Sequence, residues 1–314
     1  PTYRISFPQG VRTITPALSW PIGAESIALT ADGAALARLA VASADERTTI
    51  AAVDADGTLR LTHLAPGEGL LLDDEAPSFE TTSVEVAQLP AVPDALLIDG
   101  DQQELYVLAG REVGYWNIRD KDKPKLDETI QLVPPDVAIT DLRFLAGGHS
   151  LLVGDSRGQI TQWFPVRDEA NNFRLTRIRE FTALTRPVRQ IAPEWFRKGF
   201  LAIDADGTLG VFHATAERTL LTRPTGVADA LALAISPRAD TVLVAGHGGS
   251  AKRYGLVNEH PEVSWRSLWG KVWYEGRAQP EFIWQSSSAS SDFEPKFSLT
   301  PLAFGTLKAA FYAL

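Results

Sequence analysis

Five hairpin signals recur along this chain, and their spacing restricts the possible folds more than any other feature of the sequence. In each of them an apolar stretch ends at a tight turn and resumes as alternating apolar and polar residues. The turns centre on residues 57, 111, 158, 207 and 249, so the intervals between them are 54, 47, 49 and 42 residues. A period of roughly 40–50 residues is typical of proteins built from repeated small sheets.

An aromatic residue follows most of these turns at the same distance. The fifth residue after the turn is Trp116, Trp163, Phe212 or Tyr254 in four repeats and Thr62 in the first. A single four-stranded sheet cannot bury both of its faces, whereas radial stacking of several sheets buries them and leaves only short edges. The repeat therefore predicts an all-β fold, a WD40-like β-propeller of six blades, with seven blades as the alternative. The aromatic side chains are expected to fill the space between neighbouring blades.

The predicted propeller extends over residues 1–270. A sixth hairpin turns at Gly10, which lies 47 residues before Gly57, although no aromatic residue follows it at the expected position. Residues 25–42 contain further strand-like stretches that the repeat does not assign to a blade. No long helical periodicity occurs in this part of the chain.

The sequence DADGTL occurs twice, beginning at Asp54 and at Asp204, and a histidine (His63 or His213) follows nine residues later each time. A calcium loop of the D-x-D-x-D-G type would need a third oxygen ligand that both copies lack. Aspartate and glycine favour a hairpin, because aspartate bonds the nearby backbone and glycine accepts a positive φ. We therefore expect two equivalent turns in different blades, with the two histidines in separate places. The carboxylates expected to bind no metal are those of Asp54, Asp56, Asp204 and Asp206.

Two further segments imitate motifs of enzymes. Residues 154–158, GDSRG, match the G-x-S-x-G pattern of a nucleophilic serine, and residues 246–251, GHGGSA, match the G-x-G-x-x-A pattern of dinucleotide binding. Both motifs require a helix directly after the turn. The residues after Ser156 predict a strand, and those after the second segment are few and include Gly255. The sequence thus predicts no enzyme and no catalytic, cofactor-binding or metal-binding residues, although a propeller can gather distant Asp and His side chains at its central channel.

The composition excludes several classes of partner and site. The formal net charge is −9 and no dense stripe of Lys and Arg occurs, so a nucleic-acid partner is not expected. The chain has no cysteine, which excludes disulfides, thiolate metal sites and cysteine nucleophiles. The acidic run at residues 73–75 is typical of a solvated loop.

The last part of the sequence is of a different kind. Residues 297–314 carry one charge, Lys308, and form an apolar run, whereas a membrane-spanning helix needs roughly 20 apolar residues. Two interpretations are open: a helix docked on the domain, or the beginning of a membrane helix of a longer chain. Four tryptophans precede this run, either as core or as an interfacial belt, and we expect no helix around the first two. These residues are Trp265, Trp269, Trp273 and Trp284.

Residues 267–314, SLWGKVWYEGRAQPEFIWQSSSASSDFEPKFSLTPLAFGTLKAAFYAL, closely resemble the permease subunit of bacterial phosphate ABC transporters in its long form. In that family a segment similar to LTPLAFGTL (residues 299–307) leads into the first helix of the conserved transmembrane core. The long form carries a large insertion on the periplasmic side, between an N-terminal membrane anchor and this core.

The resemblance implies three parts of the chain: a propeller domain over residues 1–270, a Trp- and Ser-rich connector over residues 271–296, and the start of a transmembrane or membrane-proximal helix over residues 297–314. It implies a place in the inner membrane, with the domain on the periplasmic side and flanking helices in the bilayer. It also implies phosphate import energised by a separate ATPase, with a periplasmic phosphate-binding protein and the other transporter subunits as partners. The domain would be a non-catalytic interaction or regulatory module; the alternatives are a soluble propeller enzyme of the hydrolase kind and a structural spacer.

Overall fold

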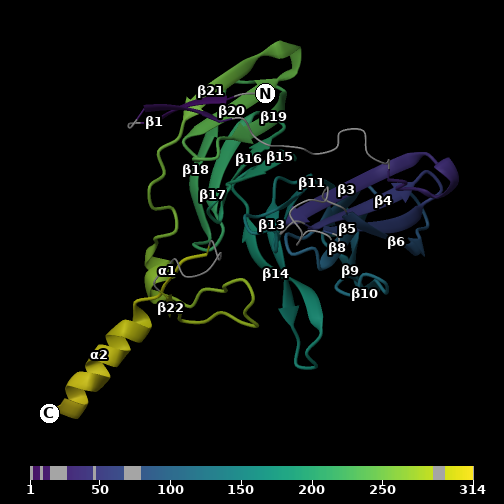
Figure 1. Ribbon diagram of the computed structural model, residues 1–314. Helices are drawn as coiled ribbons and strands as arrows, with labels where there is room; N and C mark the ends of the chain where they lie inside the picture. Colours follow the sequence, from purple (N-terminus) through teal and green to yellow (C-terminus); the bar gives the residue numbers. More distant parts are fainter. Residues whose placement is uncertain are drawn as a thin grey trace.

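The computed structural model describes residues 3–7, 10–14, 27–44, 47–66, 79–285 and 294–313. These residues fold mainly into antiparallel sheets that follow one another in chain order (Figure 1). A two-stranded hairpin comes first, four four-stranded sheets follow, and a three-stranded sheet ends the series. Within every sheet each strand pairs with its neighbours in sequence, so the chain runs up and down through it. The predicted all-β class is confirmed.

The strands have the following bounds. The N-terminal hairpin comprises β1 (Tyr3–Phe7) and β2 (Gly10–Ile14). The first four-stranded sheet comprises β3 (Leu36–Ala44), β4 (Arg47–Asp54), β5 (Thr58–Pro66) and β6 (Phe79–Gln88). The second comprises β7 (Ala95–Ile98), β8 (Glu104–Ala109), β9 (Glu112–Asn117) and β10 (Lys125–Gln131).

The third four-stranded sheet comprises β11 (Ile139–Phe144), β12 (Leu151–Asp155), β13 (Ile160–Arg167) and β14 (Phe173–Phe181). The fourth comprises β15 (Val188–Pro193), β16 (Gly199–Asp204), β17 (Thr208–His213) and β18 (Arg218–Pro224). The three-stranded sheet comprises β19 (Ala230–Ile235), β20 (Thr241–Gly246) and β21 (Ala251–Gly255).

All five turns singled out by the repeat are hairpin turns, and each joins the second strand of a sheet to the third. Gly10 likewise opens the second strand of the N-terminal hairpin, where it pairs with Phe7. Within residues 25–42, which the repeat leaves unassigned, the structure has a short 3-10 turn, η1 (Ala31–Gly33), and most of β3, the first strand of the first four-stranded sheet.

Consecutive sheets pack on one another through four hydrophobic clusters. Each cluster combines apolar side chains from two sheets that are neighbours in sequence. In three clusters the buried residues include the aromatic residue that the repeat places after the turn of the later sheet, and in the fourth this residue is partly buried and packs against the cluster. In chain order these aromatic residues are Trp116, Trp163, Phe212 and Tyr254.

Phe212 illustrates how such a residue joins two sheets. Its ring stacks on Phe200 of the same sheet, with the centroids 4.9 Å apart, and meets the edge of Phe181 of the preceding sheet at 5.6 Å. Trp163 is buried in the corresponding place, and its Nε1 donates a hydrogen bond of 2.8 Å to Thr161. The expected packing of these aromatic residues between neighbouring sheets is confirmed.

The segment after the last sheet contains a short helix that the sequence did not predict. Helix α1 spans Trp265–Trp269, so the expectation of no helix around these tryptophans was wrong. Its cause is a reciprocal cap: the hydroxyl of Ser264 accepts from the Ser267 amide at 3.0 Å, and the Ser267 hydroxyl accepts from the Ser264 amide at 2.9 Å. Serine in place of the usual Glu or Gln at the third helical position hid this signal.

A second helix, α2 (Thr300–Ala313), ends the described part of the chain and projects away from the sheets (Figure 1). A short pair of strands, β22 (Trp284–Gln285) and β23 (Lys296–Phe297), precedes it. Large apolar side chains of α2 are open to solvent, with Phe304 68% and Phe311 78% exposed. Among the described residues, no helix combines the length and the hydrophobicity needed to cross a bilayer.

The series of sheets has two distinct ends. Within each sheet, antiparallel pairing puts the turns from first to second strand and from third to fourth strand at one end and the repeat turn at the other. Turns of the first kind in neighbouring sheets contact one another, as where the amide of Gly100 donates to the carbonyl of Gly148 at 3.3 Å, so the sheets point the same way. Residues 265–285 and 294–299, which we name the C-terminal strap, contact turns of the first kind. Ser150 and Lys198, each before a second strand, and Thr215, after a third strand, bind strap residues. We call this end the strap face and the opposite end the repeat-turn face.

Candidate functional site

The two DADG turns lie on the repeat-turn face and are built alike. In the first, Asp54 Oδ1 accepts hydrogen bonds from the amides of Asp56 and Thr58 at 3.0 and 2.9 Å. In the second, Asp204 Oδ1 accepts from Asp206 and Thr208 at 3.1 and 2.8 Å. Each first aspartate therefore serves as an acceptor for its own backbone, which is the hairpin role that the sequence predicted.

Glycine is required at both turns by conformation as well as by space. Gly57 has φ of +90° and Gly207 has φ of +78°. A Cβ atom on Gly207 would lie 2.1 Å from the carbonyl oxygen of Val227, which belongs to the link into the next sheet. The turn therefore packs directly against the link that leads into the next sheet.

His63 and His213 occupy the same position in the first and fourth of the four-stranded sheets and form no common site. Burial lowers the pKa of His213 to about 3 and that of His63 to about 4. His213 Nδ1 accepts from the amide of Ala216 at 3.2 Å. Both imidazoles are therefore neutral at pH 7, as expected for buried structural histidines.

The two enzyme-like segments lie in hairpins. Ser156 sits between strands β12 and β13, and its hydroxyl accepts from the amide of Ala138 at 3.1 Å. Residues 246–251 form a short 3-10 turn, η3 (His247–Gly249), followed by strand β21. Neither segment has the helix that its motif needs, so the predicted strands after both turns are confirmed. The acidic run at residues 73–75 lies outside the described residues.

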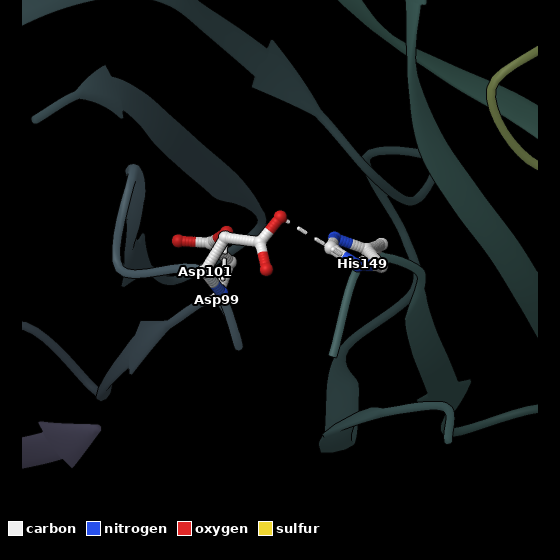
Figure 2. Close-up of side chains that lie close together, drawn as sticks. All are labelled: Asp99, Asp101 and His149. Carbon is white, nitrogen blue, oxygen red and sulfur yellow. Dashed lines mark hydrogen bonds and ion pairs between the residues drawn. The ribbon is translucent and has the colours of Figure 1, made fainter. Parts of the chain in front are cut away.

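A group of side chains whose proximity the sequence did not predict lies on the strap face. Asp99, Asp101 and His149 present ligand atoms that all lie within 4.8 Å of one another (Figure 2). His149 Nε2 is 3.9 Å from Asp101 Oδ2. The aspartates follow β7 and the histidine precedes β12, so the group combines side chains from two adjacent sheets. No local spacing signals such a group, because 48 residues separate Asp101 from His149.

The Asp99 carboxylate is already used by its own turn. Its Oδ1 accepts from the amides of Gln103 and Glu104, both at 2.7 Å, and its Oδ2 accepts from Asp101 at 3.2 Å. Burial raises the pKa of Asp99, and those amides oppose the shift. The arrangement is that of an aspartate-stabilised turn with a histidine beside it.

A pocket of about 710 Å³ adjoins this group, between the first and second four-stranded sheets. Its lining mixes cations and carboxylates, including Arg47, Lys121 and Glu80. Thr49 Oγ1 donates to Gln102 Oε1 at 2.8 Å, so the 3.0 Å contact between His63 Nδ1 and Thr49 is donated by the histidine. The buried Nε2 of His63 is then an acceptor, and it has no hydrogen-bond partner among the described residues.

A second pocket, of about 470 Å³, lies between the β9–β10 and β13–β14 hairpins and is lined mainly by basic and polar side chains. Its lining contains one carboxylate, Asp127, and four cations. The cations are Arg119, Lys125, Arg167 and Arg174. The guanidinium groups of Arg119 and Arg167 lie 4.8 and 4.7 Å from the centre of the Phe173 ring. We call these residues the arginine pocket.

The strap is fixed to the sheets by a buried network of charges. Glu275 Oε2 lies 2.5 Å from Lys198 Nζ, and its Oε1 accepts from the hydroxyl of Ser150 at 2.6 Å. Arg179 is buried, and it donates to Gln162 Oε1 at 2.9 Å and to the carbonyl of Trp273.

Glu294 completes this network. Its Oε1 accepts from Thr215 at 2.7 Å, and its Oε2 accepts from the amide of Glu275 at 2.7 Å. Burial, and next the charge of Glu275, raise the pKa of Glu294. The described parts of the predicted connector are therefore held on the sheets; its serine run, residues 286–291, lies outside the described residues.

Comparison with known proteins adds little to this geometry. No model of a known family matches the chain, and no curated protein matches it. Among solved structures, a chain from a crystal structure of the mitotic checkpoint complex is similar, with 14% sequence identity and a TM-score of 0.45. The match covers 70% of this chain and 64% of that chain, so this chain spans less than two thirds of its length.

Proposed function

We propose that this chain is the extracytoplasmic domain of a phosphate ABC transporter permease, on the periplasmic side of the inner membrane. In this role it is a non-catalytic interaction or regulatory module at the mouth of the transporter. The observation that carries the proposal is the resemblance of residues 267–314 to the long form of that permease. Helix α2 contains residues 300–307 of the segment that leads into the core helix in that family, and its exposed apolar side chains suit the beginning of a membrane helix.

We further propose that the sheets are blades of a WD40-like β-propeller with six blades, seven being the alternative count. Support comes from five consecutive up-and-down sheets that pack side by side through equivalent aromatic residues. The N-terminal hairpin β1–β2 supplies a sixth unit in the same order. Radial stacking of this kind buries both faces of the inner sheets.

The position of α2 gives the domain an orientation. The helix starts beside α1, since the amide of Leu299 donates to the carbonyl of Leu268 at 2.7 Å and Thr300 Oγ1 donates to that of Trp269 at 3.1 Å. The strap face then points toward the bilayer and the transporter, and the repeat-turn face points into the periplasm. The repeat turns are thus the surface that we assign to the phosphate-binding protein or another envelope partner.

The buried network between strap and sheets gives the module a mechanical connection. A partner bound to the repeat-turn face moves a body that is joined to α2 through Lys198, Glu275 and Glu294 rather than through a loose tether. An interaction on the periplasmic side can therefore bias the first helix of the core, which is what a regulatory module requires.

The test is a deletion in the full-length permease. Removing residues 1–262 while keeping the N-terminal anchor is expected to leave membrane insertion intact and to change phosphate uptake or its regulation. A pull-down of the domain with the phosphate-binding protein, with and without phosphate, measures the interaction directly. Normal uptake, normal starvation signalling and no binding would reject the module in favour of the spacer, and hydrolysis by the isolated chain would favour the enzyme.

A further inference from the structure

The arginine pocket lies on the same end of the molecule as the C-terminal helix. Its residues come from the turns between third and fourth strands of two adjacent sheets, and these turns belong to the strap face. In Figure 1 the β13–β14 hairpin and helix α2 extend from the sheets toward the same lower side. If α2 leads into the bilayer, the pocket faces the lipid headgroups.

Within the pocket, Arg167 is the cation whose charge is least compensated. Arg174 lies 3.4 Å from Glu128 and 3.5 Å from Asp168. Lys125 lies 3.2 Å from Asp127, and Arg119 lies 3.8 Å from Glu104. Among the described residues, no carboxylate forms an ion pair with Arg167, whose NH1 donates to the amide oxygen of Asn171 at 2.7 Å. Most donors of its guanidinium are free for a ligand.

The surroundings of Arg167 favour a compact anion with several oxygen atoms. A guanidinium binds phosphate and carboxylate oxygens in a forked geometry. Asn172 adds a side chain that can donate, and the guanidinium groups of Arg119 and Arg167 both lie over the Phe173 ring. This concentration of cations is unusual in a chain with a net charge of −9.

We propose that the arginine pocket binds the phosphate group of an anionic phospholipid headgroup. The proposal rests on the proposed function, because only a membrane at the strap face brings lipid to the pocket. Basic residues near a bilayer are attracted to anionic lipids, and the attraction adds over the residues involved. The contact would hold the domain at a fixed height and rotation above the transporter.

The test measures co-sedimentation of the whole chain with vesicles of phosphatidylcholine alone or mixed with phosphatidylglycerol. Apolar side chains of α2 can contribute to binding in both vesicles, so the ratio of the two affinities isolates the charge-dependent part. We expect the mixed vesicles to bind at least about tenfold more tightly, and we expect the double variant Lys125→Gln/Arg167→Gln to lose most of this preference.

Two controls keep the result specific. The variant Arg223→Gln/Arg253→Gln makes the same change of charge at exposed residues of β18 and β21, outside the pocket, and should keep the preference. Arg167→Lys retains the charge and should keep much of it. A wild-type chain without preference for anionic vesicles, or equal losses in both double variants, overturns the proposal.

Competition with inorganic phosphate distinguishes a pocket that binds the phosphate of a lipid headgroup from one that binds free phosphate. Adding it at the ionic strength of a chloride control should leave vesicle binding unchanged. If phosphate alone abolishes the preference, the pocket binds free phosphate and the lipid proposal is wrong. The vesicle measurement involves no transport, so the lipid site can fail while the deletion still alters uptake, and the reverse outcome is equally distinguishable.

Discussion

Lys198 and Glu275 form an ion pair with 2.5 Å between Nζ and Oε2, and both side chains are almost completely buried, at 3% and 9% exposed. Lys198 comes from the turn before β16, whereas Glu275 comes from the strap, 77 residues later. The pair joins the fourth four-stranded sheet to the segment that leads into α2. A charge buried at such a junction makes the attachment specific, because either partner alone would be a buried unpaired charge.

Replacing Lys198 by methionine should strongly destabilise the folded chain. The substitution leaves Glu275 buried without its cation, which costs about 3–5 kcal/mol. Denaturant unfolding of the whole chain measures the change. The matched control is Arg186→Gln, which removes an exposed ion pair with Asp206 and should cost less than about 1 kcal/mol. Equal losses in the two variants would mean that the strap is not held by this pair.

The Trp163→Ala variant tests the packing between sheets. Trp163 is buried in the cluster between the second and third four-stranded sheets, so truncation should cost about 3–5 kcal/mol. Trp195→Ala serves as control, because Trp195 is 61% exposed and should contribute less than about 1 kcal/mol. A loss at Trp163 as small as that of the control would contradict the assigned interface.

Two glycines with nearly the same positive φ, one of them in the second DADG turn, should respond differently to replacement by alanine. Gly207 and Gly248 have φ of +78° and +79°, so an added methyl group strains both by about 1 kcal/mol. At Gly207 it also meets the Val227 carbonyl, whereas nothing lies within 4 Å at Gly248. Gly207→Ala should therefore lower stability by about 1–3 kcal/mol more than Gly248→Ala. Comparable thermal shifts in both would show that the turn tolerates a side chain.

His213 should make the folded state sensitive to acid. Its folded pKa is about 3, against 6.5 for the free side chain, because burial disfavours the charged form. As pH falls from about 6.5 toward 3, the unfolded chain takes up a proton that the folded chain does not. The free energy of unfolding then falls by about 1.4 kcal/mol per pH unit. Above about pH 6.5 the histidine is neutral in both states, and the stabilisation is present in full.

The measurement for His213 is the difference in unfolding free energy between wild type and His213→Asn at pH 7.5 and pH 5. Asparagine offers an oxygen near the position of Nδ1, so the amide of Ala216 keeps an acceptor. Buried carboxylates such as Glu294 titrate in both proteins and cancel in the comparison. The variant should lose less stability on acidification; parallel behaviour of both proteins would contradict a buried neutral histidine.

The local order of this chain was readable from the residues alone. Hairpin turns depend on a few neighbouring residues, because aspartate accepts from its own backbone and glycine takes a positive φ. The turns at Gly57, Gly158 and Gly207 could therefore be predicted from the sequence. The period of the turns then indicates repeated sheets, and the aromatic residue five positions later indicates where neighbouring sheets meet. Each turn and its aromatic residue is recognised within a short stretch of sequence, and the period follows from comparing these stretches along the chain.

What joins residues across the chain was decided only by the tertiary structure. Asp101 and His149, or Lys198 and Glu275, carry no mutual signal in the sequence, because their proximity results from the packing of separate sheets and of the strap. The arginine pocket likewise forms only where two hairpins lie side by side. Buried charge pairs and pockets between sheets depend on how many elements pack together, whereas a turn depends on a few neighbouring residues. The sequence alone therefore predicts the turns, and only the tertiary structure shows which distant residues meet.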